Sequence, residues 1–230
     1  MYILHIETST KVCSVALSQD DRVLDCEETN DEMNHAAVLA PMIYNLLSKN
    51  NLVSQDLNAV CVSSGPGSYT GLRVGSSTAK ALAYSLEIPM ISVPTLEALA
   101  LAAKELQSSA SHLLPMIDAR RDEVYASLFD REMSIVWPDH AARVTREFVE
   151  ENLSGLAQVA CCGDGAFKVK PFLTEFPNLV LAGEVLCSAR HLVVPAYQRI
   201  NKLQTEDPLH FIPRYLKPPN ITQPGNRSGT

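Results

Sequence analysis

An apolar, strand-like run at 59–62 is joined to a helix-like run that ends near Ser85 by one segment: Gly65-Pro66-Gly67-Ser68-Tyr69-Thr70-Gly71-Leu72-Arg73-Val74-Gly75. Glycine accepts positive φ and proline fixes its own φ, so this segment predicts a tight and mostly rigid turn. Ser68 or Thr70 can cap the helix and leave free backbone N–H groups pointing outward. The segment therefore predicts a strand–turn–helix unit.

Two functions fit this glycine turn. Outward N–H groups at a helix N-terminus form a cradle for phosphate or another anion. The spacing Gly-x-Gly-x-x-x-Gly is one residue off the dinucleotide fingerprint, however, and no Gly-Lys-Ser/Thr completes a P-loop. The alternative is that the glycines only let the turn and the helix pack closely, and the local sequence leaves both interpretations open.

The predicted elements follow a similar order in the two halves of the chain. The first half has β-prone runs at 2–7, 12–18 and 22–28, an amphipathic helix with Pro41 inside it at 34–49, the strand–turn–helix unit, a strand at 89–93 and a helix at 95–106. After a polar linker at 107–111 come strands at 112–117, 123–129 and 134–137, an apolar run at 159–161, and helical runs at 145–153, 166–175 and 188–203. This order predicts two α/β lobes, 1–107 and 108–216, and a disordered tail at 217–230.

The composition is that of a globular protein with a negative charge. Hydrophobic residues make up 46% of the 230 residues, and the formal net charge is −7. This charge argues against a surface built mainly to bind nucleic acid, although a local basic patch could be hidden in it. The six cysteines contain no Cys-x-x-Cys pair, which favours buried thiols in a reducing compartment. No run approaches the apolar length of a membrane span, so we expect a cytoplasmic protein.

Three polar turns carry candidate chemistry. His5-Ile6-Glu7-Thr8-Ser9-Thr10 places an acid and three hydroxyl groups in the first hairpin, which could hold a metal-bound phosphate or simply be a polar hairpin. Asp118-Ala119-Arg120-Arg121-Asp122-Glu123 could supply a general base or form a solvated turn. The turn Gly163-Asp164-Gly165 is a weaker candidate for nucleotide contact.

A helix face of small residues suggests a different kind of site. Gly71, Gly75 and Ala79 share one face of the helix at 71–85, where another helix could approach closely, inside this chain or in a partner. The helix at 34–49, with Val38 and Met42, supplies neighbouring apolar surface. Metal and serine-hydrolase sites have little support, because the sequence has neither a His-x-x-x-His pair nor Gly-x-Ser-x-Gly.

Taken together, segments along the chain match a known family in order from residue 2 to about 216. They are 3–9, 13–17, the glycine segment 65–75, 93–99, 117–120 with 123–125, and Pro213-Arg214-Tyr215-Leu216. On these residues the chain resembles the TsaB family, the bacterial subunit of the machinery that makes threonylcarbamoyladenosine in tRNA. The resemblance implies the two-lobed, actin-like ATPase (ribonuclease H-like) α/β fold, with mixed sheets flanked by helices.

The chain departs from TsaD, the catalytic paralogue of that family. TsaD carries a His-x-x-x-His metal pair, and alignment through Glu97 places Thr95 and Leu99 there, which are not useful ligands for a transition metal. Its second phosphate loop is glycine-rich, whereas this chain has two acids and two arginines at 118–122. We therefore expect no catalytic residues and no metal site.

The resemblance implies a scaffold that binds and activates a TsaD-like subunit, which transfers a threonylcarbamoyl group to adenosine of tRNA. The expected interface residues are Val38, Met42, Gly71, Gly75 and Ala79. The expected remnants of nucleotide loops, which would bind ATP or ADP weakly, are Thr8, Ser9, Gly67 and Ser68. A TsaE-like ATPase is a further expected partner, tRNA contact is expected to be indirect, the chain alone is expected to form a homodimer, and no membrane is involved.

Two other functions stay open from the sequence. The fold and its first two loops permit an ATP-dependent phosphotransferase or an ATPase of the actin-like superfamily. A metallopeptidase, a label that this superfamily has carried, is disfavoured by the missing histidine pair.

Overall fold

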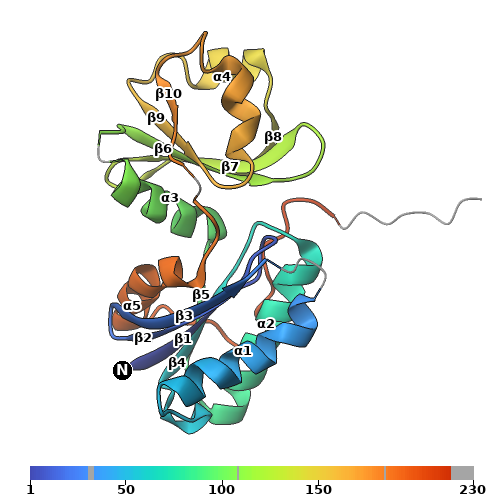
Figure 1. The fold of residues 1–230 in the computed structure, drawn as a ribbon, viewed down its shortest axis with the longest axis vertical. Helices are drawn as coiled ribbons and strands as arrows, with labels where there is room; N and C mark the ends of the chain where they lie inside the picture. Colours follow the sequence, from blue (N-terminus) through green and yellow to red (C-terminus); the bar gives the residue numbers. More distant parts are fainter. Residues whose placement is uncertain (31–33, 108, 184, 219–230) are drawn as a thin grey trace, which may run out of the picture.

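Two five-stranded mixed sheets form the framework of the chain (Figure 1). The computed structural model describes residues 1–30, 34–107, 109–183 and 185–218. Each sheet has helices on both faces, which confirms the expected α/β class. No described helix is both long enough and apolar enough to cross a lipid bilayer.

The first sheet has the strand order β3-β2-β1-β4-β5. Its strands are β1 (Tyr2–Glu7), β2 (Cys13–Gln19), β3 (Arg22–Thr29), β4 (Ala59–Ser63) and β5 (Met90–Val93). The first three form an antiparallel meander, while β4 and β5 run parallel to β1. A short 3₁₀ turn, η1 (Ser54–Asp56), leads into β4.

Side chains alternate between the two faces of β1, so both faces of the first sheet are covered. Leu4 and Ile6 pack in the core with α1 (His35–Lys49) and α2 (Tyr69–Leu86). Ile3 packs on the other face with η3 (Ala189–Leu192) and α5 (Val193–Asn201), through Leu192 and Ala196.

The second sheet has the order β10-β9-β6-β7-β8. Its strands are β6 (His112–Asp118), β7 (Glu123–Asp130), β8 (Ile135–Arg143), β9 (Val159–Cys162) and β10 (Leu179–Leu181). One face packs on α3 (Thr95–Leu106), and the other on α4 (Arg146–Asn152) and the 3₁₀ helix η2 (Ala166–Phe172).

Most expected elements are present, and the differences lie in the second half. The strand expected at 134–137 continues to Arg143, because it pairs with β7 along nearly its whole length. The helix expected at 166–175 is a 3₁₀ helix that contains Pro171. The helix expected at 188–203 is split into η3 and α5, and β10 was not expected.

Helices pack across the linker expected at 107–111, and the lobe bounds 1–107 and 108–216 stay a prediction. α3 precedes the linker, yet its Leu96 and Leu99 pack with Leu113 of the second sheet. α5 comes near the end of the chain and packs on the first sheet. Both helices lie between the sheets (Figure 1), where Arg199 Nη2 donates to Glu97 Oε2 at 2.7 Å.

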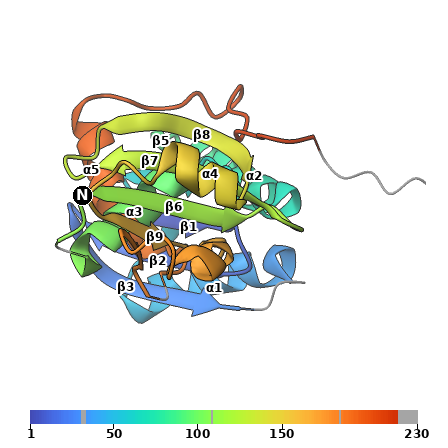
Figure 2. The ribbon, with the colours of Figure 1, turned by 90° about the horizontal axis from the view of Figure 1, so that it is seen from above.

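A C-terminal strap, residues 204–218, connects both lobes. It begins on the first sheet, where the Glu206 amide donates to the Met90 carbonyl oxygen at 2.8 Å. It continues along the first lobe, where Lys80 Nζ donates to the Phe211 carbonyl oxygen at 3.1 Å, on the side of the molecule where Figure 2 also shows β8. It reaches β8 at Arg214, whose Nη1 lies 2.7 Å from Asp139 Oδ1. Lys217 forms an ion pair with Glu123 at the start of β7. Of the tail expected to be disordered at 217–230, residues 219–230 lie outside the described residues.

Replacing Phe211 tests how strongly the strap is anchored. Phe211 is 9% exposed and belongs to the core of the first lobe. We expect Phe211→Ala to lower the free energy of unfolding by about 3 kcal/mol, because it leaves a cavity in that core. Ile212→Ala is the matched control, since Ile212 is 75% exposed. Urea unfolding measures both, and equal effects of the two variants would contradict this anchoring.

His5 predicts a loss of stability in mild acid. It is fully buried, with Nε2 2.8 Å from Ser18 Oγ, and burial lowers its pKa from 6.5 to about 3. The unfolded chain binds a proton at this position below pH 6.5 and the folded chain does not, so the free energy of unfolding falls as the pH falls through that range. This group alone should cost about 2 kcal/mol between pH 7 and pH 5.

The measurement is urea unfolding at both pH values. His5→Gln should remove that part of the pH dependence, whereas His140→Gln, at an exposed position, should retain it. An unchanged pH dependence in His5→Gln would place the acid sensitivity elsewhere.

Candidate functional site

The two loops expected to hold a nucleotide are bonded to each other. Ser68 N donates to the Ser9 carbonyl oxygen at 2.6 Å, and Thr8 Oγ1 donates to the Gly71 carbonyl oxygen at 2.8 Å. The side chain of Ser68 caps α2 by accepting from Gly71 N at 3.3 Å. The first hairpin therefore lies directly on the N-terminal turns of α2.

Glycine is required where this hairpin meets the glycine turn and the first turns of α2. A Cβ added to Gly67 or Gly71 would overlap the carbonyl oxygen of Ser9 or Thr8, respectively. A Cβ on Gly75 would overlap the hydroxyl oxygen of Thr8. The glycines thus serve close packing within the chain, which was one of the two interpretations left open by the sequence.

Glu7 fixes the same hairpin through buried hydrogen bonds. Its Oε1 accepts from Ser9 N at 2.6 Å and from Ser63 Oγ at 3.0 Å, and its side chain is almost fully buried. Burial raises the pKa of Glu7, while its hydrogen bonds to Ser9 and Ser63 act in the opposite direction. In the turn for which a metal-bound phosphate site and a plain polar hairpin were both left open, this acid fixes the backbone of its own loop.

The expected nucleotide residues differ sharply in exposure. Thr8 and Ser9 are fully buried, Gly67 is half-buried, and only Ser68 is exposed. The Ser9 hydroxyl group is buried with no partner among the described residues. Weak binding of ATP or ADP at these residues stays a prediction, and the buried hydroxyl groups of Thr8 and Ser9 do not face solvent.

The turn expected in place of the paralogue's second phosphate loop carries charged side chains that pair within the chain. Lys168 Nζ lies 2.6 Å from Asp118 Oδ1 and donates to the Glu123 carbonyl oxygen at 2.7 Å. Asp118 N donates to Asp164 Oδ1 at 2.9 Å, so the turn at 163–165 supports this hairpin. Burial raises the pKa of Asp164. Asp118 is therefore neutralised by Lys168, an arrangement unlike that of a free general base.

The tip of this β6–β7 hairpin has an unusual backbone. Arg120 and Arg121 have φ of 70° and 52°, the left-handed region that glycine prefers. This conformation costs about 1 kcal/mol for each non-glycine residue. The Arg120 amide is held by Asp118 Oδ1 at 2.8 Å. Sequence reasoning recognised a turn here but had no signal for its conformation.

The positions aligned with the metal pair of TsaD lie inside the protein. Thr95 and Leu99 are both buried on α3. Within 1–30, 34–107, 109–183 and 185–218, no group of three or more His, Cys, Asp or Glu side chains could hold a metal ion. All six cysteines are free thiols, and five of them are buried.

The small-residue face of α2 points inward, which corrects the expected interface. Gly71 and Gly75 pack on the first hairpin, and Ala79 is fully buried in the core. On α1, Met42 is 9% exposed and belongs to the same core, while Val38 is half-buried against it. A small face fits an internal strand or loop as well as an external helix, and in this fold the strand β1 and its hairpin cover it.

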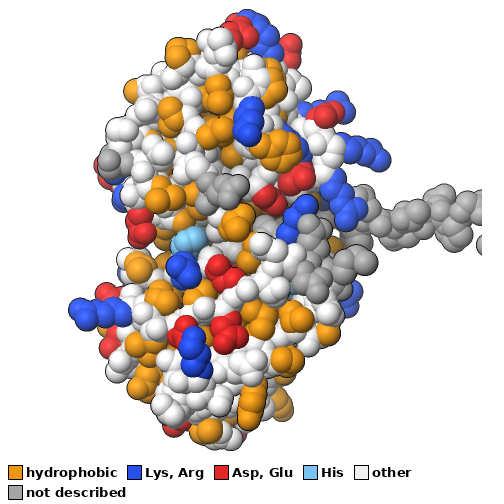
Figure 3. Space-filling view, in the orientation of Figure 1, with side chains coloured by type: hydrophobic (Ala, Val, Ile, Leu, Met, Phe, Trp, Pro, Cys, Tyr) orange, Lys and Arg blue, Asp and Glu red, His pale blue; other side chains and the backbone are white. Residues whose placement is uncertain are grey.

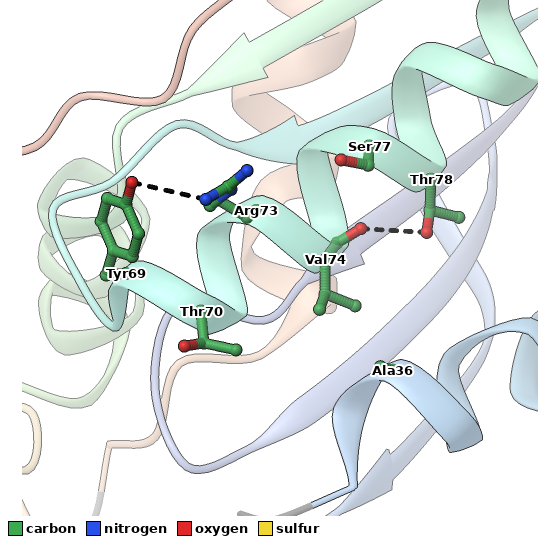
Figure 4. Close-up of a pocket in the computed structure, with 7 residues that line it drawn as sticks. All are labelled: Ala36, Tyr69, Thr70, Arg73, Val74, Ser77 and Thr78. Carbon is green, nitrogen blue, oxygen red and sulfur yellow. Dashed lines mark hydrogen bonds between the residues drawn. The ribbon is translucent and has the colours of Figure 1, made fainter. Parts of the chain in front are cut away.

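The outward surface of the same two helices forms an open groove of about 490 Å³. Figure 4 shows Ala36 of α1 across from α2, with Arg73 directed at the Tyr69 hydroxyl group at 3.5 Å. The remaining lining residues come from α2: Thr70, Val74, Ser77 and Thr78. The sequence did not lead us to predict this groove. The pattern that indicates it is a polar stripe at 70, 73 and 77, three to four residues apart on one helix face.

Gly75 provides a test of the inward packing. We expect Gly75→Ala to lower the free energy of unfolding by about 1–3 kcal/mol, because the added methyl group overlaps Thr8. The gain in helix propensity from alanine offsets only part of this loss. Gly155→Ala is the control, since its Cβ would have no neighbour within 4 Å. A Gly75→Ala protein as stable as the control would show that α2 does not pack on the hairpin.

Comparison of the sequence with known proteins identifies the family. The model of the family described as TsaD, tRNA N6-adenosine threonylcarbamoyltransferase, matches residues 27–221. A relative in Escherichia coli K12, "tRNA threonylcarbamoyladenosine biosynthesis protein TsaB", is 34% identical over 221 residues, which cover 94% of this chain and 95% of the relative.

Solved structures show the same architecture. A Pseudomonas aeruginosa protein described as similar to peptidase YEAZ has a TM-score of 0.79 at 27% identity, covering 94% of this chain and 99% of its own. The activator of 2-hydroxyisocaproyl-CoA dehydratase from Clostridium difficile has a TM-score of 0.53 at 8% identity, covering 89% and 97%, and shows the fold alone. The chain shares the fold of these structures, and it belongs to the TsaB family of tRNA threonylcarbamoyladenosine biosynthesis proteins.

Proposed function

We propose that this chain is a non-catalytic subunit that binds a TsaD-type catalytic subunit through the α1–α2 groove. The non-catalytic role is supported by contacts within the chain that close both expected phosphate loops. Thr8 and Ser9 are buried on α2, and Lys168 neutralises Asp118 where the paralogue has glycines. A nucleotide would have to displace contacts that hold the fold together.

The groove supports the second part of the proposal. Its lining mixes the apolar Ala36 and Val74 with the aromatic Tyr69 and the cation Arg73, a composition common at protein interfaces. Two more tyrosines are prominent on the same helices, Tyr44 at 72% exposure and Tyr84 at 68%. Exposed aromatic side chains beside a groove favour contact with another protein.

Further partners belong to the same proposal. Self-association of the chain alone would use this groove, and a TsaE-like ATPase would join the assembled pair. A cytoplasmic location is supported by the buried, unpaired cysteines, which fit a reducing compartment. The alternative, an ATP-dependent phosphotransferase or ATPase, would require tight ATP binding that calorimetry can measure directly.

Ser77→Arg tests the groove. Ser77 is exposed and lines the groove, so a long charged side chain would block a partner there without disturbing the core. We expect affinity for a TsaD-type subunit to fall at least about tenfold, because even one poorly accommodated, charged side chain costs more than 1.4 kcal/mol at an interface. Calorimetric titration of the purified subunits measures this affinity.

The matched control for this test is Asn45→Arg. Asn45 is exposed and lies half a turn around α1 from Ala36, so the added charge is the same and its position is outside the groove. Normal assembly by Ser77→Arg, with a circular dichroism spectrum like that of the unmodified chain, would place the partner surface elsewhere.

A further inference from the structure

The β6–β7 hairpin presents two arginines in a strained conformation. Arg120 and Arg121 are consecutive, exposed and both in the left-handed region. Neither has an ion pair with any of the described residues. Residues with such backbone conformations are concentrated at functional sites. We therefore asked which ligand the two arginine side chains could bind.

Other cations lie beside this turn. Arg143 ends β8 directly opposite Glu123 in the β7–β8 register, and it is exposed. Lys217 of the C-terminal strap is ion-paired with Glu123 and lies 6.0 Å from the ring centre of Tyr125. We call Arg120, Arg121, Arg143, Lys217 and Tyr125 the hairpin patch.

The acids near the patch do not cancel its charge. Glu123 is ion-paired with Lys217, and Asp118 with Lys168, which leaves Asp122 as the exposed acid of the turn. The arginines at 120, 121 and 143 outnumber it. Figure 3 shows Lys and Arg side chains gathered on the right-hand side of the upper lobe, where the light-green hairpin of Figure 1 lies.

Aromatic side chains extend this surface along the strap. The ring of Tyr215 packs against that of Tyr69 at a tilt of 41°, with ring centres 4.7 Å apart. Both tyrosines line a hollow of about 330 Å³ together with Lys217 and Pro218. Cations interleaved with half-exposed rings are the combination that binds phosphates and unstacked bases of RNA.

We propose that the hairpin patch binds the phosphate backbone of tRNA while the chain is assembled with its catalytic subunit. This rests on the proposed function, and it replaces the expectation of indirect tRNA contact. The net charge of −7 makes most of the protein repel a polyanion, so a local excess of arginine fixes the side from which the RNA approaches. An acidic protein surface is the competing occupant, and the experiment separates the two.

The test uses Arg120→Gly/Arg121→Gly in the full chain. Glycine adopts positive φ freely, so this double variant removes two cations and relieves the strained turn at the same time. We expect its melting temperature to be at or above that of the unmodified chain. Its affinity for a fluorescently labelled tRNA transcript should fall on the order of tenfold at 0.1 M salt, and the slope of log K against log salt should fall by about two.

The control variant is Arg22→Gln/Lys202→Gln, which removes two exposed cations elsewhere and changes the net charge equally. It should bind tRNA like the unmodified chain. Fluorescence anisotropy is measured for the chain alone and for the chain with a TsaD-type subunit, and assembly of the two proteins is measured separately.

Each outcome bears on the proposal. Loss of tRNA affinity by the glycine variant alone, with assembly intact, supports it. The proposal is overturned if both variants lose tRNA affinity equally. It is also overturned if the unmodified chain binds no tRNA at low salt, either alone or with a TsaD-type subunit. Unchanged tRNA affinity with weakened assembly also overturns it and assigns the patch to a protein partner. Failure of the unmodified subunits to assemble would count against the proposed function instead.

Discussion

The contact between the first hairpin and the glycine face of α2 is the constraint on which the first lobe depends. Backbone atoms of Thr8 and Ser9 occupy the volume that side chains at 67 and 71 would fill. The contact is held by backbone hydrogen bonds, by the Thr8 hydroxyl group and by buried Glu7. Because Glu7 also accepts from Ser63 at the end of β4, one side chain ties the hairpin to the strand that leads into α2.

The same contact engages groups that the expected nucleotide loops would present to a ligand. Phosphate loops work by presenting free N–H and hydroxyl groups to a ligand. Here those of Ser68 and Thr8 are bonded within the chain. In the second lobe, the ammonium group of Lys168 lies beside Asp118 at the corresponding hairpin. Contacts within the chain thus engage polar groups at both of these hairpins, and the outer surface of α1 and α2 is left open.

The sequence predicted the strand–turn–helix unit at 59–85 because glycine, proline and apolar periodicity all act locally. It could not predict which face of α2 is covered, since the small residues at 71, 75 and 79 fit a loop, a strand or a helix equally well. β10 is only three residues long and carries no usable periodicity. The left-handed arginines at 120 and 121 also have no local signal, because their conformation is imposed by the hairpin and by Asp118.

The packing of η3 and α5 on the first sheet has a consequence for synthesis on the ribosome. The face of the first sheet that contains Ile3, Ala59 and Ile91 is covered by Leu192 and Ala196. Those residues are made about 100 positions after the last strand of that sheet, which ends at Val93. A nascent chain therefore carries one finished sheet with an incompletely covered apolar face while about 100 further residues are made. Such a surface is a binding site for chaperones and a risk for aggregation until the C-terminal residues emerge.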